Sequence, residues 1–125
     1  MNTDDFAKAL IRRRQIFLTV TGRRTGRAIT IPVWFVSDDR AVWLLPVYGS
    51  NTQWYRNLKK NRAITIQVAT WRQDLRARLL KSEEAVNRVI RRFQEKYTSK
   101  EIKRWYKGLD VAVQIPLPAA GAQRA

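Results

Sequence analysis

The chain has 125 residues, no cysteine, no histidine and a formal net charge of +15 at pH 7. Its length suits one domain, and the missing residue types exclude disulfides, the usual zinc and transition-metal sites, and nucleophilic Cys or Ser–His catalysis. Seventeen of the 25 basic residues are arginines, whose forked donors bind phosphate and carboxylate groups, so the charge indicates a nucleic acid, an anionic membrane surface or a phosphorylated cofactor, unless it is only a solvated surface.

The first half of the chain is expected to begin with a helix and to continue mainly as strands. Residues 4–14 have the pattern of a short helix with acidic residues in its first turn. Segments rich in β-branched and aromatic residues follow as strands at 15–21, 27–36 and 41–47. The apolar period then changes to that of a helix over about residues 50–60.

The second half is expected to alternate again between strands and helices. Strands are predicted at 62–70 and 74–80. Ser82 caps a helix with apolar residues on one face, and Thr98 opens a short further helix. A last strand is predicted at 110–116.

This order of elements favours hairpins over long βαβ crossovers, which predicts an antiparallel sheet or small barrel flanked by helices. We expect one domain over residues 1–125 with a loose tail at 117–125. With no secretory leader pattern and no apolar run near the ~20 residues of a membrane span, a cytoplasmic location is expected. The ten acidic residues are scattered, so we expect no metal site, and an enzyme built from these side chains would need a cofactor for its chemistry.

The turn between the first two strands, Gly-Arg-Arg-Thr-Gly at residues 22–26, has an unusual density of glycine and arginine, and Arg27 follows it directly. Glycines permit backbone angles at which successive amides point into one concavity, a nest for an anion. The arginines would surround that nest with forked donors. This interpretation favours a phosphate or polycarboxylate ligand, and a plain hairpin with its arginines in water is the alternative.

A second segment, residues 46–61, joins a strand end and a Gly-Ser-Asn turn to a helix that carries Trp54 and Tyr55. Backbone amides at such a helix start can hold anionic or carbonyl oxygens. Trp54 and Trp34 are large flat groups that could bound a planar ring. The alternative is an amphipathic helix that uses its aromatic residues as core.

The two segments, LTVTGRRTGRAITIPVWFV and VWLLPVYGSNTQWYRNLKKNRAITIQV, resemble the deazaflavin-dependent nitroreductases, which are small oxidoreductases that bind flavins or deazaflavins. The resemblance covers about residues 16–70 and continues more weakly to residue 116. It implies an α+β fold, a six-stranded antiparallel split β-barrel with flanking helices. It also implies hydride transfer from the reduced deazaflavin coenzyme F420 to a nitroaromatic, quinone or enone, with FMN as the alternative cofactor.

The resemblance assigns candidate residues to the cofactor site. The turn that holds the phosphate and acidic tail is matched by Arg23, Arg24, Thr25 and Gly26, with Arg27 next to them. The strand along the ring is matched by Pro32, Val33 and Trp34. The turn at the carbonyl edge of the ring is matched by Val47, Tyr48, Gly49 and Ser50, and the helix that closes the pocket by Trp54, Tyr55 and Asn57.

The candidate substrate residues rest on a looser match. Tyr97, Trp105 and Tyr106 correspond to aromatic residues that the family places near its substrate. No catalytic side chain is assigned with certainty, and the proton that accompanies the hydride would come from Tyr55, Tyr106 or solvent.

Two departures from the family pattern leave alternatives open. Arg27, Ala28 and Ile29 stand where the family usually has a residue followed by Pro-Arg, so either Arg27 replaces that arginine or the grip on the tail is lost. The ring-side turn lacks the usual Gly-Gly pair. A non-catalytic binding protein of the same fold for a flavin or other planar ligand therefore remains an alternative. A basic nucleic-acid-binding protein ranks below it because no such motif is recognisable. Contact with an anionic membrane surface and a homodimer stay open.

Overall fold

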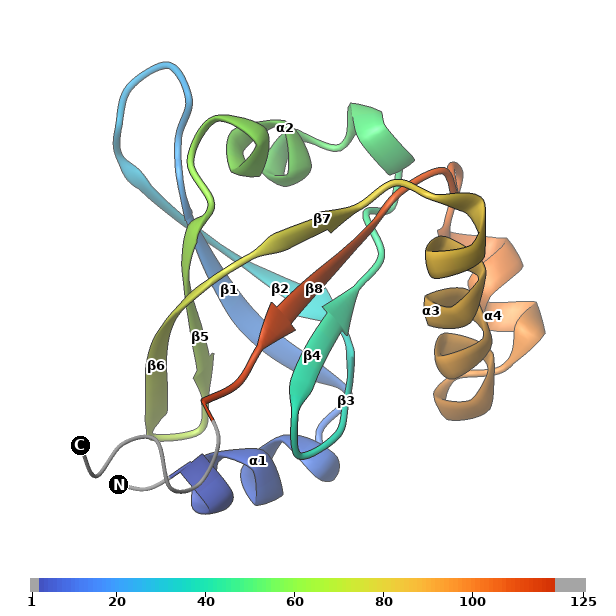
Figure 1. Ribbon diagram of the computed structural model, residues 1–125, viewed down its shortest axis with the longest axis horizontal. Helices are drawn as coiled ribbons and strands as arrows, with labels where there is room; N and C mark the ends of the chain where they lie inside the picture. Colours follow the sequence, from blue (N-terminus) through green and yellow to red (C-terminus); the bar gives the residue numbers. More distant parts are fainter. Residues whose placement is uncertain (1–2, 119–125) are drawn as a thin grey trace.

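The computed structural model describes residues 3–118, with side chains from Phe6 onward, and shows an α+β fold with two four-stranded antiparallel sheets (Figure 1). The strands are β1 (Gln15–Thr21), β2 (Ala28–Trp34), β3 (Val36–Ser37), β4 (Ala41–Leu44), β5 (Ala63–Val68), β6 (Trp71–Arg76), β7 (Arg78–Leu80) and β8 (Ala112–Pro116). The helices are α1 (Thr3–Ile11), the 3-10 turn η1 (Gly49–Asn51), α2 (Gln53–Lys60), α3 (Glu83–Lys96) and α4 (Ser99–Trp105). The strand orders are β2-β1-β5-β6 and β3-β4-β8-β7.

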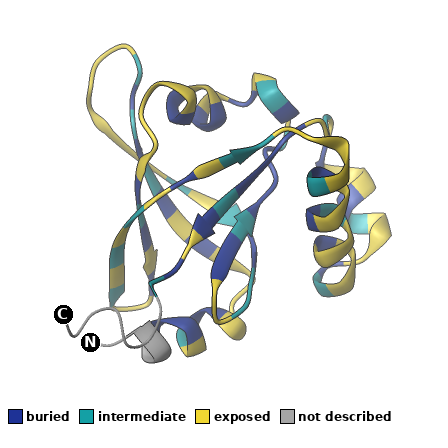
Figure 2. Ribbon diagram, in the orientation of Figure 1, coloured by how far each residue is buried: buried dark blue, intermediate teal, exposed yellow. Residues whose placement is uncertain are grey.

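The main hydrophobic core lies between the two sheets. In β1 the side chains of Ile16, Leu18 and Val20 are buried, whereas Phe17 between them is exposed, because successive side chains of a strand point to opposite faces. Helix α1 runs across one end of the sheets (Figure 1) and has buried positions along it (Figure 2). Its residues Phe6 and Leu10 are buried members of this core. The α+β class and the antiparallel pairing that the sequence predicts are therefore confirmed.

Two of the six predicted strands pass from one sheet into the other. The segment predicted at 27–36 forms β2 and β3, which meet at Phe35, and the segment predicted at 74–80 forms the end of β6 and all of β7, which meet at Ala77. Both junction residues are buried. The structure thus has eight strands where six were expected, because buried bends at the sheet corners interrupt two continuous segments.

Helices α3 and α4 lie side by side next to the second sheet (Figure 1) and enclose a smaller apolar cluster. The predicted caps are both confirmed: Ser82 Oγ accepts from the Ala85 amide at 3.2 Å, and Thr98 Oγ1 accepts from the Glu101 amide at 3.2 Å. These two caps fix where each helix begins, and therefore which of their aromatic residues face β2 and β3.

The ends of several elements differ from the prediction. Strand β4 ends at Leu44 rather than at residue 47, since Pro46 has no N–H to donate to a sheet. Leu117 is buried and its amide donates to the Arg40 carbonyl at 2.7 Å, so the segment predicted as a loose tail is packed at its first residue. The rest of that prediction, residues 119–125, lies outside the described part of the chain. Between residues 3 and 118, no helix has the length and apolar character needed to cross a membrane.

Candidate active site

A cavity of about 700 Å³ opens between β2, the segment that joins β4 to α2, and the end of α4. From the first sheet it is lined by Gln15, Ile29, Ile31, Pro32, Val33 and Trp34. From the β4–α2 segment and α2 it is lined by Leu45, Val47, Tyr48, Thr52, Gln53, Trp54 and Asn57, and from the end of α4 by Trp105 and Tyr106. A cavity of this volume, mostly apolar with a few polar groups, has the character of a small-molecule or cofactor site.

One wall of the cavity is a stack of aromatic rings around Trp34. The Trp34 ring lies parallel to the ring of Tyr97, with centroids 4.5 Å apart and an interplanar angle of 5°. Tyr106 lies tilted against Trp34 at 6.2 Å, and the Arg14 guanidinium lies 5.6 Å from the Trp34 centroid. Trp34 is therefore held from behind by neighbours on other elements, which gives the cavity a rigid flat surface.

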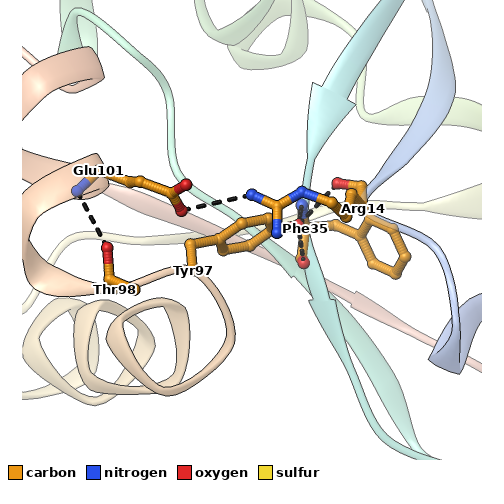
Figure 3. Close-up of polar contacts among 5 residues, drawn as sticks. All are labelled: Arg14, Phe35, Tyr97, Thr98 and Glu101. Carbon is orange, nitrogen blue, oxygen red and sulfur yellow. Dashed lines mark hydrogen bonds and ion pairs between the residues drawn. The ribbon is translucent and has the colours of Figure 1, made fainter.

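Tyr97 anchors this stack to the bend between β2 and β3. Figure 3 shows its side chain extending toward Arg14 and Phe35, with Glu101 paired to Arg14 beside it. The Tyr97 hydroxyl accepts from the Phe35 amide at 3.0 Å and lies 2.8 Å from the Phe35 carbonyl and 2.7 Å from the Arg14 carbonyl, either of which can accept its proton. Burial raises the pKa of Tyr97 to about 12, so the hydroxyl is protonated and remains a donor at neutral pH.

The β1–β2 hairpin is attached to α2 through Arg23. Its Nη1 donates to Asn57 Oδ1 and its Nη2 to Gln53 Oε1, both at 2.8 Å, and Lys60 Nζ donates to the Arg23 carbonyl at 2.9 Å. The residues on α2 are spaced at i, i+4 and i+7, which places them on one face of the helix. In Figure 1 α2 accordingly lies between the hairpin tip and η1.

Three other arginines carry positive charge beside this contact. The recorded ion pairs of the described residues leave Arg24, Arg27 and Arg56 without an acidic partner. Partial desolvation lowers the pKa of Arg23, and the nearby guanidinium groups of Arg56 and Arg24 lower it further. Since Arg23 is bonded to the lining residues Gln53 and Asn57, the positive charge around it lies on the hairpin side of α2, where an anionic ligand could neutralise it.

The amides of the hairpin and of the second turn are largely used within the chain. In the hairpin, the Gly26 amide donates to Gly22, and the Arg27 amide donates to Thr25 Oγ1. In the second turn, every amide from residue 48 to residue 52 has an acceptor, and that of Ser50 donates to Asp110 Oδ1 at 2.9 Å. In the second turn the amides of residues 48–52 are thus all engaged, and in the hairpin those of Gly22, Arg23, Gly26 and Arg27 are engaged.

Asp110 ties the second turn to the segment after α4. Its carboxylate also accepts from Ser50 Oγ at 2.6 Å, and the hydrogen bond from that hydroxyl is the main reason why the pKa of Asp110 is lowered. Tyr48 forms a parallel bridge with Gly108, and the Lys107 amide donates to the Val47 carbonyl at 2.7 Å. These contacts hold the end of α4, with its two cavity-lining aromatic residues, against the β4–α2 segment.

Replacing Gly49 by alanine should destabilise the protein by about 2–4 kcal/mol. Gly49 has φ +57, and an added Cβ would collide with the Asp110 carboxylate and lie 3.0 Å from the Gly108 carbonyl, so backbone strain and steric overlap combine. Gly26→Ala is the matched control: Gly26 has φ +73 but no atom within 4 Å of an added Cβ, and about 1 kcal/mol is expected. Denaturant unfolding measures both, and equal losses would show that the contact with Asp110 contributes nothing.

The structure brings together half of the residues that the sequence assigned to the site. Those lining the cavity are Pro32, Val33, Trp34, Val47, Tyr48, Trp54, Asn57, Trp105 and Tyr106. Those outside its lining are Arg23, Arg24, Thr25, Gly26 and Arg27 in the hairpin, and Gly49 and Ser50 in the turn. Of these, Arg23 is bonded to the lining residues Gln53 and Asn57. Tyr97 lies behind Trp34, and Tyr55 is 1% exposed with its hydroxyl in the core, so Tyr55 cannot deliver a proton into the cavity.

The sequence interpretation missed several lining residues. They are Gln15, Ile29, Ile31, Leu45, Thr52 and Gln53. Three of them follow from periodicity, since Ile29 and Ile31 share a strand face with Val33, and Gln53 lies one helical turn before Asn57. No sequence signal marks Gln15, because its place on the cavity depends on the register between β1 and β2, where it pairs with Trp34.

These residues fit a planar cofactor with an anionic tail. The cavity is lined by Trp34 and Trp54, and its α2 wall is joined to the arginine-rich hairpin through Arg23. The Asp110 carboxylate is bound to Ser50, and within residues 3–118 no ion pair joins an acidic residue to an arginine of the hairpin. A deazaflavin with a phosphate-bearing tail matches this combination.

Comparison with known proteins agrees with this fit. The family model described as F420H(2)-dependent quinone reductase matches residues 2–116. The structure of the F420-H2 dependent reductase FDR-A is 22% identical, with a TM-score of 0.65, over 82% of this chain and 94% of that one. An F420 reductase is 17% identical, with a TM-score of 0.63, over 90% of this chain and 92% of that one. A structure described as a domain-swapped dimer is 20% identical, with a TM-score of 0.66, over 90% of this chain and 91% of that one. The chain therefore belongs to the family of F420-dependent quinone reductases and is an oxidoreductase that uses reduced F420.

Proposed function

We propose that this protein reduces a quinone at the cavity between β2, α2 and the end of α4. The observation that carries this proposal is that Arg23 of the hairpin is bonded to two lining residues of an apolar cavity with tryptophan in its walls, Gln53 and Asn57. Arg24 and Arg27 follow in the same hairpin and have no ion pair within residues 3–118. Reduced F420, when bound, supplies the hydride, and a quinone that accepts a hydride and a proton becomes a hydroquinone. Nitroaromatic and enone acceptors, which accept hydride in the same way, are the further candidates.

The residues of the chain would divide the work between binding and orientation. Arg24, Arg27 and Arg56 bind the phosphate and acidic tail at the open end near α2. Trp34 and Trp54 bound the planar ring system, so the cofactor and the acceptor are held in contact in a site with little water.

Tyr106 is the proposed source of the proton. It lines the cavity, whereas the hydroxyl of Tyr55 does not. Burial raises the pKa of Tyr106 above the ordinary tyrosine value, and the neighbouring Tyr97 adds to the rise. Its hydroxyl is therefore protonated at neutral pH and can donate a hydrogen bond to an oxygen that gains negative charge.

Several finer points are proposals of the same kind. Because β2 continues into β3 and β6 into β7 at both pairs of sheet edges, we describe the fold as one six-stranded split β-barrel in a single domain. A homodimer, a cytoplasmic location and contact with an anionic membrane surface belong here too, the last supported by the net charge of +15. Size-exclusion chromatography with light scattering tests the homodimer.

The function is tested by titration and turnover. The purified protein is titrated with oxidised F420 and with FMN, each followed by fluorescence, and the oxidation of reduced F420 is then followed with a water-soluble naphthoquinone or a nitroaromatic compound as acceptor. We expect micromolar or tighter binding of F420, weaker binding of FMN, and faster turnover with the quinone. Binding of F420 without turnover of any acceptor would instead support a non-catalytic binding protein.

A further inference from the structure

Arg23 differs from the other arginines of the hairpin because its side chain is already engaged. Both terminal nitrogens of its guanidinium group donate to α2, Nη1 to Asn57 and Nη2 to Gln53, each at 2.8 Å. Its backbone is attached there as well, since the amide donates to Asn57 Oδ1 at 3.1 Å and the carbonyl accepts from Lys60. A guanidinium group with hydrogen bonds at both terminal nitrogens has little freedom to turn toward a ligand.

This contact determines which way the Asn57 side-chain amide points. Two N–H donors of Arg23 face the same Asn57 atom, and only the oxygen of an amide can accept them. The NH₂ group of Asn57 must therefore point away from Arg23. Asn57 is 5% exposed and is one of the residues that line the cavity.

The NH₂ group of Asn57 has no recorded acceptor within residues 3–118. Among the described residues, the only fully buried side-chain N or O atom without a hydrogen-bond partner is Tyr55 Oη. The nitrogen of the Asn57 amide is therefore not fully buried. An amide nitrogen that is neither paired nor fully buried keeps some exposure, and Asn57 is one of the residues that line the cavity. The wall formed by α2 thus presents a fixed hydrogen-bond donor to whatever fills the cavity.

We propose that Arg23 is a positioning residue that orients the Asn57 amide as a hydrogen-bond donor toward the cavity. The α2 wall then selects ligands that have an acceptor oxygen. Gln53 fixes the guanidinium by accepting from its Nη2. The inference rests on the proposed function at the same cavity, and assigns the charged tail to Arg24, Arg27 and Arg56 rather than to Arg23. The acceptor is a ring carbonyl or a phosphate oxygen of the cofactor.

A double-mutant cycle on the Kd for oxidised F420 tests whether Arg23 acts through Asn57. We expect Arg23→Ala and Asn57→Ala each to raise the Kd by about tenfold, and the double variant to raise it by about tenfold as well rather than a hundredfold. Arg24→Ala with Asn57→Ala is the matched control, for which the separate factors should multiply. Multiplying factors for Arg23 and Asn57 would overturn the proposal, because Arg23 would then contact the ligand itself.

Asn57→Asp tests the donor without removing the acceptor that Arg23 needs. The carboxylate still accepts from Arg23, so the thermal unfolding midpoint should not fall, but it presents an oxygen to the cavity and should weaken F420 binding at least tenfold. A deazaflavin without phosphate or tail is the second probe: weakened binding of both ligands identifies the ring carbonyl as the acceptor, and weakened binding of F420 alone identifies the phosphate. If Asn57→Asp binds F420 as the wild type does, the role of the donor is refuted, whereas failure of the wild type itself to bind F420 would refute the proposed function.

Discussion

Replacing Arg24 and Arg27 together by alanine is expected to raise the Kd for oxidised F420 by about 100-fold or more. Each charge-assisted contact to a phosphate or carboxylate contributes ~1.5–3 kcal/mol, and the loss of two of them should be nearly additive. Neither side chain is part of the hydrophobic core, and neither belongs to a recorded ion pair of residues 3–118. The thermal unfolding midpoint should therefore stay within a few degrees of the wild type.

Two controls separate this local effect from the general attraction of a basic protein. Arg72→Ala with Arg76→Ala removes the same charge from exposed positions on β6, at the sheet edge opposite β2, and should change the Kd less than threefold at ~0.15 M salt, where distant charges are screened. A deazaflavin lacking phosphate and tail should bind equally to the wild type and to the Arg24/Arg27 variant. Similar losses in both double variants would mean that net charge, not the hairpin, holds the tail.

Much of the fold is predictable because its signals are local. The alternation in β1 and the caps at Ser82 and Thr98 each depend on a few adjacent residues, and all of them agree with the structure. The bends at Phe35 and Ala77 were missed. At Phe35 the bend is accompanied by hydrogen bonds with Tyr97, 62 residues later in the chain, and no local pattern reports such a partner.

In the candidate site, too, the features that depend on adjacent residues were predicted and those that depend on distant residues were not. The hairpin with its arginines and the helix with Trp54 carry local motifs, and the structure joins them through Arg23. The local pattern cannot show which donors are already used. The local pattern indicated a free amide at Ser50, whereas Asp110, 60 residues away, accepts from that amide. The pattern also did not distinguish Arg23, whose side chain is bonded to α2, from Arg24, which has no ion pair within residues 3–118. The assignment of individual roles therefore depends on long-range hydrogen bonds.

Tyr97→Phe is expected to lower the free energy of unfolding by about 2 kcal/mol. The change removes the acceptor of the buried Phe35 amide and the donor to the Phe35 or Arg14 carbonyl, and unsatisfied buried groups cost ~1–3 kcal/mol. The phenylalanine ring keeps the stack against Trp34. The loss in the free energy of F420 binding should therefore be smaller than the loss in the free energy of unfolding. Tyr55→Phe is the matched control, because the Tyr55 hydroxyl is buried without a partner among the described residues and its removal should be neutral or stabilising.

The stability difference between the wild type and Tyr97→Phe should also depend on pH in a predictable direction. The pKa of Tyr97 is raised to about 12 in the folded protein, chiefly by burial, from the ordinary value near 10 in the unfolded chain. The folded state thus keeps a proton that the unfolded state loses, so this contribution is complete below about pH 10 and is lost as the pH rises through about 12. The neighbouring Arg14, Glu101 and Lys96 are present in both proteins. Urea unfolding between pH 8 and pH 11 should show a constant difference at first and a shrinking one above pH 10, and a constant difference throughout would mean that the hydroxyl is not sequestered at the Phe35 bend.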